Sequence, residues 1–169
     1  KNINPFGSSG IDTIIRLGDK GIFMAKDDDT NLEPWVSDGT SSGTMVLREI
    51  NPYGSSAPDQ FMKGNNLIYF AAEDSTYGRE LYRTDGTPAG TWQVIDLNPL
   101  SGDANPELLA VRGDTLYFAA DDGTNGRELY ATTGTTMSTR RLSDHIGGTG
   151  SDIKAVGFIQ DTVYVALNT

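Results

Sequence analysis

The stretch LYFAADDGTNGRELYATTGTTMSTRRL, from Leu116 to Leu142, contains the pattern from which the whole chain is built. Short runs of Leu, Tyr, Phe and Ala alternate in it with Gly, Asp, Asn and Thr, so it predicts a strand, a Gly-rich turn, a second strand, a Gly/Thr turn and a third strand. The same layout occurs at Leu67–Leu97 and, with more differences, at Ile22–Ile50. The chain is therefore a tandem repeat.

Equivalent residues of the copies lie 47 or 48 residues apart. The columns that fix this period are Phe23/Phe70/Phe118/Val165, Trp35/Tyr82/Tyr130 and Asn4-Pro5/Asn51-Pro52/Asn98-Pro99. Periods of this size are typical of propeller blades and of some helical solenoids. Helical repeats are excluded because no apolar pattern with a 3.6-residue period is sustained over ten residues. The prediction is an all-β fold.

Each period contains four predicted strands. In the best-defined copy they are Glu107–Arg112, Thr115–Ala120, Arg127–Thr132 and roughly Thr139–Leu142. Two-residue turns are expected to join neighbouring antiparallel strands where residues tolerate a positive φ, at Gly18-Asp19, Asn65-Asn66 and Gly113-Asp114. Four meandering strands per period predict the blade of a β-propeller, or of part of one, in which each blade is stable only against its neighbours.

Residues 1–169 form one repeat domain in this interpretation. It consists of remnants at 1–17, full-period copies at about 18–64, 65–113 and 114–160, and a partial copy at 161–169. The last two strands are expected at Asp152–Ile159 and Thr162–Leu167.

Two arrangements stay open for the ends of the chain. The N-terminal residues Lys1–Ile3, which align with Arg48–Ile50, could join the C-terminal strands in a closed ring of four units. Alternatively, the chain is an excerpt of a longer array. We expect the residues that follow Thr169 to contain another near-copy of GRELYxTDGTxxGT. In either arrangement the missing outer strand would leave an open edge, where a neighbouring subunit could add a strand.

Three segments carry a family resemblance: EPWVSDGTSSGT (33–44), ELYRTDGTPAGT (80–91) and ELYATTGTTMST (128–139). They resemble the bacterial ELWxxDGT repeat, which is found in tandem in large secreted or surface proteins. The first copy has Pro34 where Leu is usual, and the third has Thr133 in place of Asp and Ser138 in place of Gly. These departures look like drift. The resemblance implies a propeller-like module located outside the cell or at the bacterial cell surface, and it transfers no catalytic motif.

The charge of the chain narrows the range of partners. Thirteen basic and 23 acidic residues give a net charge of −10, which disfavours nucleic acids and anionic membrane surfaces. No apolar run approaches the ~20 residues needed to cross a bilayer, so membrane insertion is not expected. The chain has no cysteine, which excludes disulfides and thiolate metal sites. The expected partners are a protein or a glycan at the cell surface, or other copies of the chain.

Acidic loops recur at the same turn of each copy and are candidates for calcium. Ca²⁺ takes six to eight oxygen ligands in flexible geometry, and such ligands are crowded in these loops. The alternative is a hairpin loop in which Asp and Asn side chains accept hydrogen bonds from backbone N–H groups. The candidate ligands are Asp27, Asp29, Glu33, Asp74, Glu80, Asp121, Asp122, Asn125 and Glu128, of which the third loop is the best set.

Other repeated residues have structural explanations. The DGT turns at Asp38-Gly39-Thr40 and Asp85-Gly86-Thr87 are expected to shape a turn between two strands, and the Trp35/Tyr82/Tyr130 column to pack between units. Arg79-Glu80 and Arg127-Glu128 are expected to pair across units. Aromatic residues in loops are freer to bind a ligand, and the candidates are Tyr53, Tyr77 and Trp92.

Nothing in the sequence predicts a catalytic site. His145 is the only histidine, and Ser143-Asp144-His145 are adjacent in sequence, which is not the geometry of a catalytic triad. We therefore expect a non-enzymatic module for adhesion or assembly, with calcium as a candidate cofactor. The alternatives are a carbohydrate-binding or carbohydrate-active propeller, and a self-assembling structural subunit.

Overall fold

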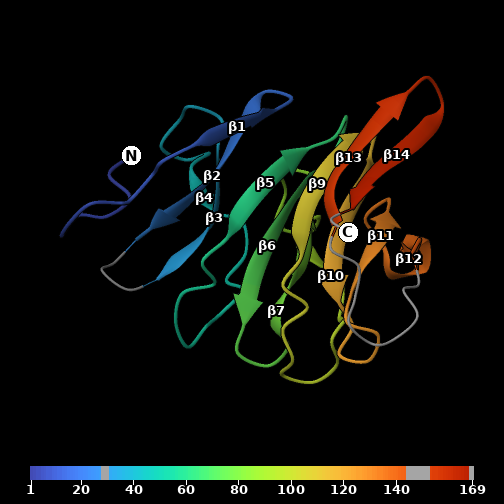
Figure 1. Cartoon of the computed structure of the whole chain (residues 1–169). Helices are drawn as coiled ribbons and strands as arrows, with labels where there is room; N and C mark the ends of the chain where they lie inside the picture. Colours follow the sequence, from blue (N-terminus) through green and yellow to red (C-terminus); the bar gives the residue numbers. More distant parts are fainter. Residues whose placement is uncertain (28–30, 144–152, 168–169) are drawn as a thin grey trace.

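The computed structural model describes residues 1–27, 31–143 and 153–167, and their regular structure is all-β apart from one short 3₁₀ helix. The strands form three four-stranded antiparallel sheets and one two-stranded sheet, and each sheet is made of consecutive strands. The sheets follow one another side by side in chain order, from blue to red in Figure 1. The predicted fold class, four-stranded antiparallel units in tandem, is confirmed at this level.

The first sheet contains β1 (Ile14–Leu17), β2 (Lys20–Lys26), β3 (Leu32–Ser37) and β4 (Met45–Val46). The second contains β5 (Asp59–Lys63), β6 (Ile68–Asp74), β7 (Gly78–Thr84) and β8 (Trp92–Ile95). The third contains β9 (Glu107–Arg112), β10 (Thr115–Asp121), β11 (Arg127–Thr132) and β12 (Arg140–Arg141), with the 3₁₀ helix η1 (Thr136–Ser138) before β12. The fourth contains β13 (Ile153–Ile159) and β14 (Thr162–Leu167). Each sequence repeat of 47 or 48 residues therefore runs from the second strand of one sheet to the first strand of the next.

The aromatic columns form the core between and within the sheets. Trp35, Tyr82 and Tyr130 are all buried, as predicted from their fixed place in the repeat. In the second sheet Phe70 stacks on Tyr82 with the ring centroids 5.8 Å apart, and Phe118 and Tyr130 repeat this pair in the third sheet. Burial of these aromatic pairs removes apolar area from water and fixes an offset ring geometry. One sheet cannot cover both of its own faces, so the neighbouring sheets have to complete the burial.

Polar side chains link the first sheet to the backbone of the second, and the second to the backbone of the third. Lys20 Nζ donates to the Gly86 carbonyl of the second sheet at 2.8 Å. Tyr69 OH donates to the Asp114 carbonyl of the third sheet at 2.6 Å. Gly64 N donates to the Leu67 carbonyl at 2.8 Å across Asn65 and Asn66, so these two residues form the predicted turn between β5 and β6. Asn66 also donates to the Asp114 carboxylate through its backbone and its side-chain amide.

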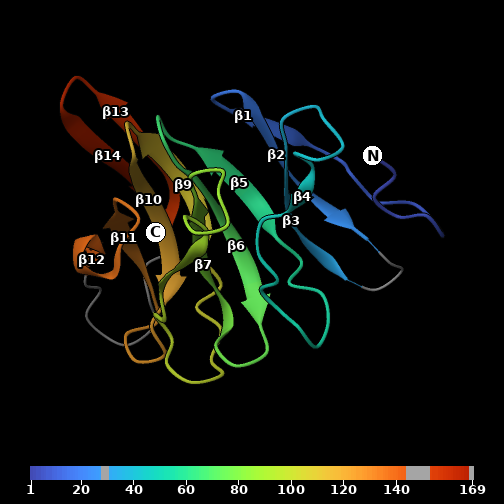
Figure 2. The same cartoon turned by 180° about the vertical axis from the view of Figure 1, so that it is seen from behind.

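The row of sheets is not closed into a ring within the described residues. The inner strands β1, β5, β9 and β13 lie next to one another in this order. The first and fourth sheets lie at opposite ends of the row in both views (Figures 1 and 2). Lys1 Nζ donates to the Thr44 carbonyl, and Ile3 packs against Phe23 and Trp35, so the N-terminal residues lie against the first sheet.

Candidate functional site

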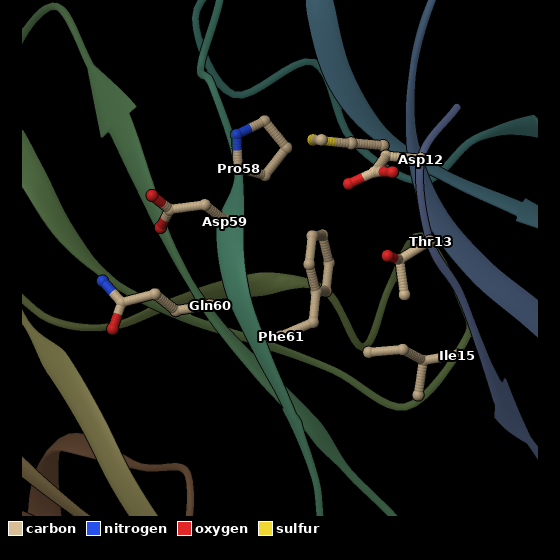
Figure 3. A pocket seen from close by; sticks show the side chains of 8 residues that line it. Asp12, Thr13, Ile15, Pro58, Asp59, Gln60 and Phe61 are labelled. Atoms are coloured by element: carbon tan, nitrogen blue, oxygen red, sulfur yellow. The ribbon is translucent and has the colours of Figure 1, made fainter. Parts of the chain in front are cut away.

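A groove lies between the inner strands of the first and second sheets (Figure 3). Its volume is about 290 Å³, close to the lower end of the range for small-ligand sites. One wall comes from β1, the residues before it, and β2, and the other from the start of β5. The lining residues are Asp12, Thr13, Ile15, Met24, Pro58, Asp59, Gln60 and Phe61.

The groove has an apolar floor with polar groups beside it. Phe61 stacks on Phe70 at 5.2 Å, which fixes the orientation of its ring in the second sheet. Figure 3 shows this ring facing Thr13 and Ile15 across the groove. An apolar surface with a few polar groups at its margin is the composition typical of ligand-binding sites.

The polar side chains of β5 are already engaged. Asp59 forms an ion pair with Arg79, which also donates to the Ala57 carbonyl at 3.3 Å. The Gln60 amide turns toward the third sheet and binds two backbone groups there. On the opposite wall, Asp12 and Thr13 form no hydrogen bond or ion pair with any part of the chain that the structure describes. The free polar groups of the groove therefore come from the first sheet.

We predicted that Arg79-Glu80 and Arg127-Glu128 pair across units, and this prediction is wrong. Arg79 pairs with Asp59 and Arg127 with Glu107, in each case within one sheet. Glu80 is fully buried and does not take part in these pairs.

The three buried glutamates hold the loops that lead to the next sheet. The Glu80 carboxylate accepts hydrogen bonds from the backbone N–H groups of Leu97, Asn98 and Ala104 at 3.1–3.2 Å. Glu33 accepts from the equivalent loop after β4, and Ser143 Oγ donates to Glu128. Burial raises the pKa of Glu80 to about 7, although the three N–H donors favour the charged form. Desolvation likewise raises the pKa of Glu33.

The carboxylates of the acidic turns accept hydrogen bonds from their own loops. In the third loop Asp122 accepts from the backbone N–H groups of Thr124 and Asn125, from the Asn125 amide and from Tyr130 OH. Desolvation, which would raise the pKa of Asp122, is outweighed by these bonds, and its pKa is lowered. Asp121 accepts from Gly123 N at 2.8 Å.

The other predicted calcium ligands are distributed as follows. Asp74 accepts from Thr76 N at 2.7 Å, Asp27 is exposed, and Asp29 lies outside the described residues. Within residues 1–27, 31–143 and 153–167, no group of three or more His, Cys, Asp or Glu side chains is placed to hold a metal ion. Glu33, Glu80 and Glu128 point into the interior, and the Asp residues lie on the turns. Calcium binding stays a prediction.

The three aromatic residues expected to bind a ligand are not brought together. Tyr53 and Tyr77 are 88% and 42% exposed. Tyr53 lies in the loop before β5 and Tyr77 in the turn between β6 and β7, so both lie at the end of the second sheet where β6 ends. Trp92 begins β8 at the opposite end, where the Arg83 guanidinium lies 3.6 Å from its ring centroid. Asp144 and His145 lie outside the described residues. Sequence reasoning missed the groove residues Asp12, Thr13 and Phe61.

Comparisons with known proteins bear on the fold alone. No family model matches the sequence, and no curated protein does. Among solved structures the chain is similar to TolB from Acinetobacter baumannii, with a TM-score of 0.50 and 15% sequence identity. The superposition covers 92% of this chain and 41% of the TolB chain, so the present chain spans about two fifths of that protein. The likeness supports a β-propeller-like all-β fold. The described residues include no helix that is long and apolar enough to span a membrane.

Proposed function

We propose that this chain is a non-enzymatic binding module of an extracellular or cell-surface repeat protein, and that it serves in adhesion or assembly. The observation that carries the proposal is the groove of Figure 3, where an apolar floor and the unengaged side chains of Asp12 and Thr13 face solvent. In the second sheet the equivalent residues are engaged, Asp59 by Arg79 and Gln60 by the backbone of Pro106 and Leu108. The resemblance to ELWxxDGT repeats supports a location outside the cell.

The placement of the carboxylates supports binding over catalysis. A glycosidase needs two carboxyl groups that face one sugar from opposite sides. In the groove Asp59 is neutralised by Arg79, which leaves Asp12 as the one unpaired carboxylate among its described lining residues. The carboxyl groups with raised pKa values, Glu33 and Glu80, are buried against backbone N–H groups and have no access to a substrate.

We also propose that the sheets are blades of a β-propeller that is larger than the part described. The side-by-side order of the inner strands supports this, as does the likeness to TolB over 92% of this chain. In a propeller, blades bury their faces against their neighbours around an axis.

The binding function is tested by presenting the immobilised chain to peptide, protein and glycan arrays. We expect saturable binding to a peptide or protein surface, weakened at least tenfold by Thr13→Trp, which fills the groove. Thr76→Trp, at an exposed turn, is the matched control. Binding that Thr13→Trp leaves unchanged, or no saturable binding at all, would refute the proposal. Turnover of a glycan by the wild-type chain would favour the carbohydrate-active alternative.

A second candidate function is self-assembly, which the edge of β14 favours. Within the described residues β14 pairs with β13 alone. Tyr164, Val165 and Leu167 are 51%, 41% and 52% exposed, and an unpaired apolar strand edge is a template for strand addition. Light scattering after size-exclusion chromatography should then show species that grow with concentration, and Val165→Lys should abolish them. A wild-type chain that stays monomeric at high concentration would exclude this mode.

A further inference from the structure

The groove is the place where the side-chain links of the repeat are interrupted. In the second sheet Arg79 binds both the Asp59 carboxylate and the Ala57 carbonyl. In the third sheet Arg127 repeats both contacts, to Glu107 at 2.7 Å and to the Asn105 carbonyl at 3.0 Å. One guanidinium thus bridges a carboxylate and a carbonyl in each of these sheets.

The first sheet keeps the two acceptors and lacks the arginine. Alignment of the repeats places Asp12 at the position of Asp59, Gly10 at that of Ala57, and Leu32 at that of Arg79. Gly10, Ala57 and Asn105 all have positive φ, of 63°, 41° and 45°, so the backbone that carries the carbonyl follows the same course. Leucine has no donor, and Asp12 has no other partner among the described residues.

A further side-chain link joins the second sheet to the third and has no counterpart between the first and second. Gln60 Nε2 donates to the Pro106 carbonyl, and Gln60 Oε1 accepts from Leu108 N, both at 3.1 Å, which ties β5 to β9. The equivalent residue of the first sheet is Thr13, whose side chain is too short to make such a bridge. No side chain of the described first sheet therefore reaches the Pro58 carbonyl, and the space between β1 and β5 stays open.

We propose that the groove binds an arginine side chain of a partner protein. Its guanidinium takes the place that Arg79 and Arg127 occupy in the later sheets, and donates to the Asp12 carboxylate and the Gly10 carbonyl. The methylene groups of the arginine lie on the apolar floor formed by Ile15 and Phe61. This inference rests on the proposed binding function and names its ligand class.

Arginine fits this pair of acceptors better than other ligands do. A guanidinium presents several N–H donors in a rigid plane and can bridge two acceptors, whereas a lysine ammonium is a compact point charge. A sugar hydroxyl brings no charge to Asp12. The net charge of −10 on the chain also attracts a basic partner at long range.

The test uses the full chain and three short peptides, acetyl-Gly-Gly-Xaa-Gly-Gly-amide with Xaa as arginine, lysine or citrulline, titrated at low salt and followed by NMR. We expect the arginine peptide to shift the amide signals of Gly10, Asp12 and Thr13. It should bind about tenfold more tightly than the citrulline peptide, since the pair is charge-assisted. Asp12→Asn should remove the preference, whereas Asp19→Asn, at another exposed acid of the first sheet, should not.

Leu32→Arg provides an independent test, because it supplies the arginine that the first sheet lacks. We expect this variant to melt no lower than the wild type and to lose arginine-peptide binding, since its own guanidinium occupies Asp12. Equal binding of the arginine and citrulline peptides, or unchanged binding by Leu32→Arg, would overturn the inference. If either of these results is found but Thr13→Trp still weakens binding to the array partners, the proposed function survives. If Thr13→Trp leaves all binding intact, the proposed function fails as well.

Discussion

Asp85 shows how one side chain determines which residue can stand five positions away. Its carboxylate accepts hydrogen bonds from Thr87 N at 2.9 Å and Thr87 Oγ1 at 2.6 Å, which closes the DGT turn. A Cβ on Gly90 would lie 2.0 Å from Asp85 Oδ1, so the turn excludes any side chain there. Asp38 and Gly43 repeat this relation in the first sheet.

The third copy replaces this pair with a different one. Thr133 stands in place of the Asp, and Ser138 in place of the Gly. Ser138 Oγ accepts from Thr135 N and Thr133 N at 3.2 and 3.1 Å, as the Asp carboxylate accepts from Thr87 N in the second sheet. The two departures that look like drift in the sequence are therefore one coupled exchange.

A double-mutant cycle at these positions should show strong coupling. Asp85→Thr removes the turn acceptor, and Gly90→Ser displaces the Asp85 carboxylate, so each single change should lower the free energy of unfolding by about 1–3 kcal/mol. The double variant recreates the third copy and should recover at least ~1 kcal/mol of the summed loss. Urea unfolding of the four proteins measures this. Strict additivity would mean that Ser138 does not replace the Asp carboxylate.

The buried carboxyl of Glu80 should make stability depend on pH. Its pKa of about 7 in the folded chain lies above its ordinary value of 4.5. Between these values the folded state holds a proton that the unfolded state releases, so stability falls as the pH rises through this window. The shift corresponds to roughly 3 kcal/mol at most. Urea unfolding at pH 5 and pH 8 should show a smaller loss for Glu80→Gln than for the wild type. Equal losses in both proteins would show that Glu80 is already ionised at pH 5.

At the scale of the elements, strands with clear alternation were predictable. β9, β11 and β14 have the bounds that the sequence predicts. β12 is shorter than predicted, and it begins at Arg140 because Thr139 is the C-terminal cap of η1, whose N-terminal end Thr135 and Ser138 close with a capping box. Helical turns of this length leave no periodic signal.

The roles of the polar residues were less predictable. Glu80 lies two residues before the buried Tyr82, so period-2 alternation places both on one face of β7, and this signal was available. Its partners were not predictable, because they are backbone N–H groups of a distant loop. Finding the groove required a comparison of columns across copies, in which Leu32 and Thr13 stand where the second sheet has Arg79 and Gln60.

The turn between β10 and β11 should be stable without calcium. Asp122 already accepts hydrogen bonds from Thr124, Asn125 and Tyr130, and Asp121 accepts one from Gly123. Thermal unfolding should therefore give the same midpoint with excess EDTA and with millimolar CaCl₂. MgCl₂ at equal ionic strength controls for screening. A midpoint that falls with EDTA and is restored by Ca²⁺ alone would establish a calcium site and refute this prediction.

At the scale of the whole molecule, stability should vary along the row of sheets. The second sheet has neighbours on both sides, and its Tyr69, Phe70 and Leu81 are fully or almost fully buried. The fourth sheet touches the row through β13, and all described residues of β14 are at least partly exposed. In repeat proteins stability is the sum of unit and nearest-neighbour terms, so terminal units open first.

Hydrogen exchange followed by mass spectrometry should resolve this gradient. We expect peptides from β6 and β7 to exchange most slowly and those from β14 to exchange fastest, because β14 is paired with β13 alone among the described strands. Val156→Ala, in β13, should speed exchange in the fourth sheet and leave β6 protected, whereas Phe70→Ala should lower protection in every sheet. Uniform protection from β1 to β14 would instead require contacts between the first and fourth sheets. Such contacts would show that the row closes into a ring in solution.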